Sequence, residues 1–175
     1  MDTTPLRHAY RVFLDAAATV AGSGDTRPAP PAGEWNAGQI LAHVSLVSAA
    51  TIAAVSAVAS GANTTYDNRT ALDAWTIERV IALAGGSAGL QDRTCRQGDA
   101  LCALVGPVLS ETELDTLVPA LLLSNDTLLV NQPMPLRDLI TGLADTELPG
   151  HTQQLLALLP DGTRRVQEMN TAHSE

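Results

Sequence analysis

The sequence contains no lysine, so all ten of its basic residues are arginines. A lysine Schiff base and a lysine-activated nucleophile are therefore excluded as catalytic devices. Aromatic residues make up only 3% of the chain, which means that the hydrophobic core has to be built from Leu, Val, Ile and Ala. A core of this composition favours packed helices over an aromatic-rich β-sandwich.

Positive charge is also scarce. Nineteen acidic residues outnumber the ten arginines, the net charge is −9, and the sequence pI is about 4.7. Arg164 and Arg165 form the one pair of adjacent basic residues. Because binding to a phosphate backbone requires a basic face, we expect no nucleic-acid partner.

A long stretch of the chain lacks charge altogether, since no Asp, Glu, Lys or Arg stands between Glu34 and Asp67. The stretch is long enough to raise the question of a membrane span. It nevertheless contains His43, several serines and threonines and many alanines, and its larger apolar residues are periodic. The N-terminal residues also lack the basic-then-apolar pattern of a secretory signal. We therefore expect a soluble, cytoplasmic protein without a membrane partner.

Cysteine is rare as well, with Cys95 and Cys102 as its two occurrences. On one helix they would lie about 10 Å apart along the axis, which is too far for a disulfide. We expect two reduced cysteines in the core.

Helical periodicity of apolar residues dominates the rest of the chain. It predicts helices near 4–22, 36–59, 69–105 (broken or kinked near 85–87) and 135–159. Asn36 with Gln39 forms a capping-box pattern at the start of the second helix, and Ser110 with Glu113 predicts a short helical turn. Two apolar runs around Ser-Asn-Asp predict a hairpin near 118–131. The predicted fold is an all-α four-helix bundle with a small β-hairpin before the last helix, in a single domain over 1–162 with a polar tail over 163–175.

Two histidines fall inside apolar helices. His43 lies within the apolar arc of the second helix, roughly 40° from Val47, and therefore points inward. His151 follows Glu147 by four residues, so the two can share a helical face. Pro149 stands between them and either kinks the helix or lies in the first turn of a new helix capped by Thr146.

Two interpretations of these residues remain open. Two histidines and a carboxylate from two helices can hold a catalytic divalent ion, with a position open to water or substrate. Alternatively, His43 and His151 are separate buried histidines, and Glu147 is a surface carboxylate.

The segments "PAGEWNAGQILAHV" and "LPGHTQQLLALLP" resemble the DinB-like family, which includes mycothiol-dependent maleylpyruvate isomerases and related bacterial thiol S-transferases. The resemblance covers most of residues 4–160 in order. It implies a four-helix bundle, often dimeric, with a divalent metal such as Zn²⁺ or Ni²⁺ held by one histidine of helix 2 and two ligands of the last helix. His43 matches the first ligand. The last-helix pair is His-x-x-x-His, which would end at Leu155 and leave the site incomplete, or Glu-x-x-x-His, which fits Glu147 and His151.

Three functions follow from these observations. The first is a metal-dependent S-transferase or isomerase that uses a low-molecular-weight thiol such as mycothiol on a small electrophile. The second is a metal-free bundle that binds an apolar small molecule or a partner helix. The third is a stress-related protein without catalytic activity. The sequence identifies no general base and no thiol-binding residue.

Overall fold

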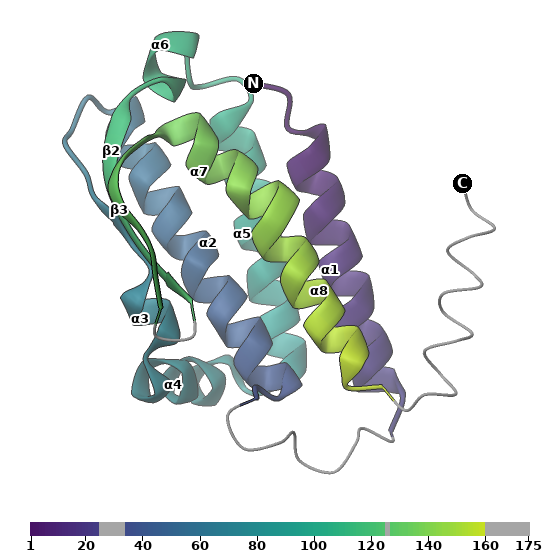
Figure 1. Ribbon diagram of the computed structural model, residues 1–175. Coiled ribbons are helices and arrows are strands. Elements are labelled where there is room, and N and C mark those ends of the chain that lie inside the picture. The colour runs from purple at the N-terminus through teal and green to yellow at the C-terminus, as the bar shows by residue number, and fades with distance from the viewer. Residues whose placement is uncertain (25–33, 125–126, 160–175) are drawn as a thin grey trace.

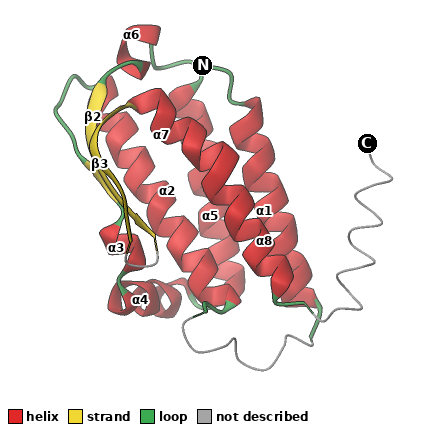
Figure 2. Cartoon of the chain, in the orientation of Figure 1, coloured by secondary structure: helices red, strands yellow, loops and turns green. Residues whose placement is uncertain are grey.

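A computed structural model describes residues 1–24, 34–124 and 127–159. These residues are mostly helical and include one small three-stranded sheet (Figures 1 and 2). The predicted tail over 163–175, with Arg164 and Arg165, lies outside the described residues. So do most of the proline-rich connection before the second helix and the tip of the hairpin.

The first two helices begin and end as predicted. Helix α1 covers Thr4–Gly22 and buries one apolar face, which includes Leu6, Tyr10, Phe13, Ala17 and Val20. Helix α2 covers Ala37–Ala59. Its capping box is present, because the side chains of Asn36 and Gln39 each accept a hydrogen bond from the other residue's backbone N–H at 3.0 Å. The first turn of α2 is therefore held in place beside the site described below.

The third predicted helix is divided into α3 (Arg69–Leu72), α4 (Ala74–Ala84) and α5 (Ser87–Val105). The predicted break near 85–87 is confirmed, because Gly85 and Gly86 have φ values of 72° and 102° that side-chain-bearing residues rarely adopt. A second break at Asp73 was not predicted. Its carboxylate accepts the backbone N–H of Thr76 at 2.8 Å and starts α4 as an N-cap.

Three side chains of this region differ from the prediction. Apolar periodicity assigns Trp75 and Leu83 to the buried face of the third predicted helix, but α4 packs on one side only and leaves them 74% and 66% exposed. Cys102 is buried and Cys95 is exposed, and both are free thiols. The expectation of two core cysteines is therefore wrong for Cys95, which faces away from the packed side of α5.

The predicted hairpin is formed by antiparallel strands β2 (Leu117–Ser124) and β3 (Thr127–Pro135). It is preceded by the short helix α6 (Glu111–Leu114), which has the predicted capping box. A two-residue strand, β1 (Tyr66–Asp67), pairs in parallel with β2 and was not predicted. Asn68 extends this pairing, because its side chain both donates to and accepts from the backbone of Leu123 at 2.9 Å.

The last helical segment is continuous but changes its pitch. Helix α7 (Leu136–Gly142) passes into a π-helical turn, η1 (Leu143–Glu147), and then into α8 (Leu148–Ala157). The backbone N–H of Leu148 bonds to the carbonyl of Leu143, five residues back. A new helix capped by Thr146 is therefore wrong, since Thr146 lies inside the π turn and makes no capping hydrogen bond.

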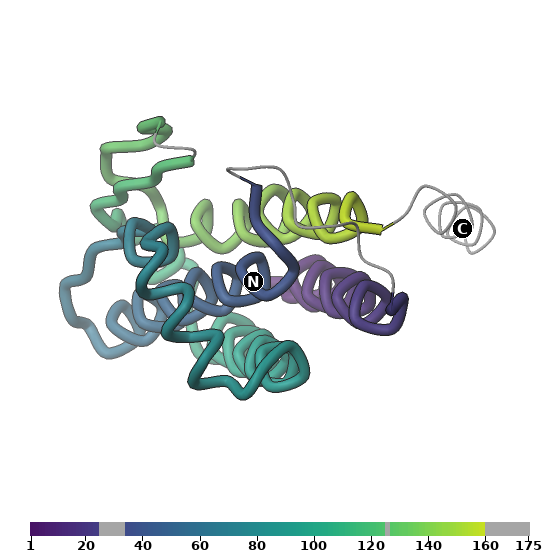
Figure 3. Tube along the Cα trace, turned by 90° about the horizontal axis from the view of Figure 1, so that it is seen from below, coloured from purple at the N-terminus to yellow at the C-terminus, as the bar shows by residue number. Residues whose placement is uncertain are grey.

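The long helices lie side by side. Helix α1 contacts α5 and α8, and α2 contacts α5 and α8, while the sheet lies to one side next to α2 and α7 (Figures 1 and 3). Within the described residues, α2 is the one helix long and apolar enough to cross a membrane by length and composition. Its apolar 18-residue window is 61% buried inside the structure.

Candidate metal centre

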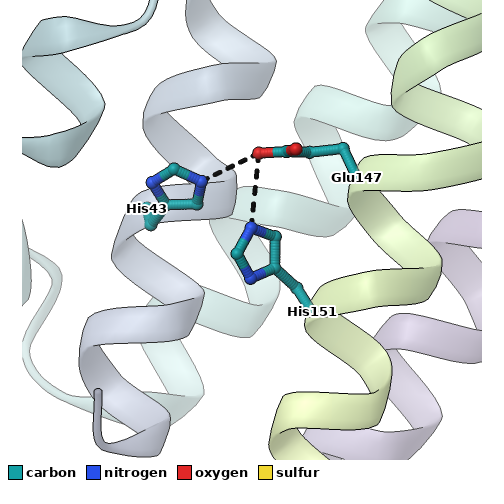
Figure 4. A group of neighbouring side chains, drawn as sticks. All are labelled: His43, Glu147 and His151. Atoms are coloured by element: carbon teal, nitrogen blue, oxygen red, sulfur yellow. Dashed lines mark hydrogen bonds and ion pairs between the residues drawn. The ribbon is translucent and has the colours of Figure 1, made fainter. Parts of the chain in front are cut away.

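The three predicted ligands lie together. His43 extends from the middle of α2, Glu147 from the end of η1, and His151 from the first turns of α8 (Figure 4). The Nε2 atom of His43 is 2.9 Å from Oε1 of Glu147, and the Nε2 atom of His151 is 3.3 Å from the same oxygen. Each residue offers one ligand atom, and the three atoms are all within 4.8 Å of one another.

His43 has a defined tautomer because of a backbone contact. Its side chain is buried, and its Nδ1 atom is 2.8 Å from the carbonyl oxygen of Ala71 in α3. A carbonyl oxygen can only accept, so Nδ1 must carry the proton and donate it. In the neutral ring, the lone pair therefore lies on Nε2 and points at Glu147. Metal-bound histidines are commonly held by a contact of this kind.

His151 is oriented in a similar way from its own helix. Its side chain is 11% exposed, and its Nδ1 atom is 2.8 Å from Oε1 of Gln154, three residues later. With this amide oxygen as acceptor, Nδ1 again donates and Nε2 faces the site. Both imidazoles thus direct the same atom toward one carboxylate oxygen.

Trp35 forms one wall of the site. Its ring centroid is 4.7 Å from that of His43 and 6.2 Å from that of His151. The side chain is half-buried, and most of the proline-rich connection next to it lies outside the described residues. The N′ position of Trp35, directly before the Asn36 cap, predicts that it packs at the start of α2. The structure adds that it packs on the two histidines. Because Trp35 is brought there by the chain entering α2, no spacing rule could have identified this contact.

The carboxyl group of Glu147 is held in its ionised form. Burial alone would raise its pKa, but hydrogen bonds and charge interactions with His151 and His43 outweigh burial and bring the pKa well below its usual range. An ionised carboxylate offers only lone pairs, and so does an imidazole Nε2 that carries no proton. Such groups repel one another unless a proton or a metal cation lies between them.

This donor set fits a divalent ion. Two imidazole nitrogens and a carboxylate oxygen are ligands that Zn²⁺ accepts, and bonds of 2.0–2.1 Å in a tetrahedral site would separate neighbouring ligand atoms by about 3.3 Å. The separations of 2.9 and 3.3 Å are close to this value. Three protein ligands leave one position open, which is the pattern of catalytic rather than structural zinc sites.

Leu155 belongs to the core and not to the site. Its side chain is fully buried and does not line the cleft at the candidate metal centre. Of the two ligand patterns considered from the sequence, the structure therefore brings together the Glu147–His151 pair. His8 is exposed on α1 and contacts Arg11, and His173 lies outside the described residues.

The site opens into a large cleft. The cleft has a volume of about 1130 Å³ and lies between α2, the α7–η1–α8 segment and the hairpin. Its walls are mainly apolar and include Ile40, Val47, Leu122, Leu129, Met134, Leu139 and Leu143. Its size is that of a pocket for a small molecule with a molecular mass in the drug range.

Tyr66 also lines this cleft. Its hydroxyl is 3.2 Å from Oγ1 of Thr51, and burial raises the pKa of the phenol above its usual value. The hydroxyl of Thr51 donates to the carbonyl of Val47, so Tyr66 acts as the donor in the Tyr66–Thr51 bond. Tyr66 and Gln154 are among the polar residues of the cleft that the sequence pattern did not single out.

Searches against protein-family models, curated proteins and solved structures found no match to this chain.

Proposed function

We propose that this chain is a four-helix bundle of the DinB-like type that holds a divalent metal, Zn²⁺ or Ni²⁺, at His43, Glu147 and His151. We further propose that it is an enzyme that uses a low-molecular-weight thiol such as mycothiol in S-transfer to, or isomerisation of, a small electrophile. The observation that carries the proposal is the convergence of three ligand atoms within 4.8 Å, with both imidazoles held by Nδ1 contacts.

The arrangement of the chain supports the family part of this proposal. One ligand comes from the middle of the second long helix and two come from the last, four residues apart. This is the ligand order that the resemblance implies, and the packing of α1, α2, α5 and α7–α8 is the one expected of such a bundle.

The protein supplies orientation and exclusion of water. A divalent ion bound here would act as a Lewis acid and lower the pKa of a coordinated thiol or water. His43 and His151 would hold it from two helices, and the carboxylate of Glu147 would offset half of its charge. Trp35 covers the two imidazoles on one side, and the apolar cleft on the other side provides room for an electrophile.

Metal content is the first test. Protein purified without chelator or metal-affinity resin should contain about one divalent ion per chain by elemental analysis, or take up one Zn²⁺ or Ni²⁺ in competition with a chromophoric chelator. Glu147→Gln keeps the shape of the side chain but removes its charge. Loss of a contact that only supports a metal ligand typically lowers metal affinity by about 10–100-fold, so the change in a ligand itself should weaken metal binding by at least that factor. His8→Ala, which alters an exposed histidine, is the matched control.

Thiol consumption is the second test. In S-transfer, metal-loaded protein should accelerate loss of free thiol when a small electrophile is supplied; in an isomerisation, it should convert the electrophile only when the thiol is present, with no net loss of thiol. His43→Ala should abolish either effect. Wild-type protein that binds no Zn²⁺, Ni²⁺ or Mn²⁺ would contradict the proposal and favour the metal-free binding module. Stable metal binding without any thiol chemistry over a panel of electrophiles would restrict the function to metal-dependent binding.

A further inference from the structure

We infer that the cleft selects ligands that carry no negative charge beyond the end that reaches the metal, and that Asp138 is the main residue responsible. This inference rests on the proposed function, because it concerns the part of the ligand that extends away from His43, Glu147 and His151.

Apart from His43 and His151, which would hold the proposed metal, the charged residues that line the cleft are all acidic. Glu34, Asp138 and Glu147 are its acidic residues, and no arginine is among the described residues that line it. Within residues 1–24, 34–124 and 127–159, neither Glu34 nor Asp138 takes part in an ion pair.

Arginines that are adjacent to the cleft in sequence are held elsewhere. Arg137 precedes Asp138, but its guanidinium lies 2.6 Å from Asp115 and 2.9 Å from Glu111, near α6. Arg69 follows the cleft residue Asn68, but its Nε atom lies 2.9 Å from the carboxylate of Asp67. Two carboxylates therefore hold Arg137 away from Asp138, and the cleft keeps its negative charge.

The positive charge of the proposed metal ion does not offset the negative charge of the cleft. A divalent ion that is bound by Glu147 and by one thiolate is fully neutralised by those two ligands. Asp138 and Glu34 then remain as uncompensated charges along the rest of the cleft. A second anionic group on the ligand would be repelled there, while an amide, a hydroxyl or an ammonium group would not be.

The position of Asp138 defines where this selection acts. Asp138 lies nine residues before Glu147 on the cleft face of the α7–η1–α8 segment, or roughly 13 Å along the helix axis. Leu139 and Leu143 lie between the two in sequence, and Leu122 of the hairpin lines the same cleft. The ligand is thus expected to have a reactive thiol or electrophile at one end, an apolar middle and an uncharged or cationic far end.

Three alkanethiols of one chain length, ending in a carboxylate, an amide or an ammonium group, test this inference. Their affinities can be measured on the Co²⁺-loaded protein by the thiolate-to-cobalt charge-transfer absorption. The ammonium thiol should bind about tenfold more tightly than the carboxylate thiol, and the amide thiol should lie between them, since the carboxylate adds a repulsive contact, the ammonium an attractive one and the amide neither. The difference should shrink in high salt.

Asp138→Asn should reduce this preference to about threefold or less. Asp145→Asn removes the same charge from an exposed position of η1 that does not line the cleft, and it should leave the preference unchanged. Equal binding of all three thiols, binding of none of them, or an unchanged preference in Asp138→Asn would overturn the inference. Failure to bind Co²⁺ at all would instead refute the proposed metal site. Calorimetry with the same three thiols on metal-free protein would then still show whether the cleft rejects the carboxylate.

Discussion

Replacing His43 with alanine separates its structural contribution from its proposed ligand role. The side chain is 3% exposed, and it donates to the carbonyl of Ala71 while facing the carboxylate of Glu147. Its removal leaves a cavity and an unpaired buried carbonyl, whereas Glu147, at 35% exposure, can still reach water. In metal-free protein the free energy of unfolding should therefore fall by about 1–3 kcal/mol.

The metal-dependent part is measured on the same pair of proteins. Zn²⁺ at about one hundred times its dissociation constant should stabilise the wild type by about 2.7 kcal/mol. For a chain of this size that corresponds to a rise in thermal midpoint of about 5–10 °C. His43→Ala retains two ligands and should lose nearly all of this rise. Calorimetry with and without Zn²⁺ gives both values, and circular dichroism confirms that the variant keeps its helices.

Two outcomes would refute the reasoning. If His43→Ala keeps the full Zn²⁺-dependent rise, the metal is bound elsewhere and the ligand set is wrong. If the wild type contains no metal and gains nothing from Zn²⁺, Ni²⁺ or Mn²⁺, His43 is a buried histidine whose role is to pack and to bond to Ala71. His8→Ala should show neither effect, because that histidine is exposed on α1.

Further predictions concern pH and packing. The pKa of Glu147 is lowered in the folded protein, so its ionised form stabilises the metal-free fold at pH values above 4.5, the ordinary pKa of the group, and this contribution is lost as the pH falls. The difference in thermal midpoint between wild type and Glu147→Gln should therefore narrow in acid. A difference that stays constant with pH would contradict this prediction. The Trp75→Phe variant reports the emission of half-buried Trp35, and the Trp35→Phe variant reports that of Trp75, which is 74% exposed. The emission maximum of Trp35 should lie at the shorter wavelength. A red-shifted Trp35 would contradict its packing on the site. Gly98→Ala should destabilise the fold by about 1–3 kcal/mol, because the new Cβ would lie 2.8 Å from a buried tyrosine ring. Gly150→Ala, whose Cβ meets nothing within 4 Å, should instead stabilise the helix by about 0.5–1 kcal/mol; equal thermal shifts in the two variants would contradict this account of the packing.

Local signals explain why most of the helices could be predicted. A capping residue fixes the start of α2, and a pair of glycines fixes the end of α4, so both boundaries depend on a few neighbouring residues. Strand β1 has no such signal, because two residues acquire their conformation by pairing with Ala120 and Leu121 of β2. The exposure of Trp75 could not be predicted either, since it depends on how α4 sits against its neighbours.

The site was predictable to the extent that it follows helical periodicity. The inward direction of His43 and the shared face of Glu147 and His151 are properties of single helices. The distance between the two helices and the contacts of His43 with Trp35 and with the carbonyl of Ala71 are not properties of a single helix, so the sequence pattern does not predict them. The latter contacts fix the tautomer of His43 and cover its ring, and both arise from chain segments that approach only in the folded protein.

Pro149 links the sequence to the geometry of the last helix. In a regular α-helix its ring would clash with the carbonyl of Asp145, and that carbonyl would lose its hydrogen bond. The sequence therefore left two solutions, a kink or a new helix, but the structure adopts a third. The wider π turn over Leu143–Glu147, in which Leu148 bonds five residues back, shifts the carbonyls relative to the ring and keeps the segment continuous. π turns of this kind occur frequently at functional sites. The π turn ends at Glu147. The same turn therefore avoids the clash with Pro149 and carries the carboxylate that faces both histidines.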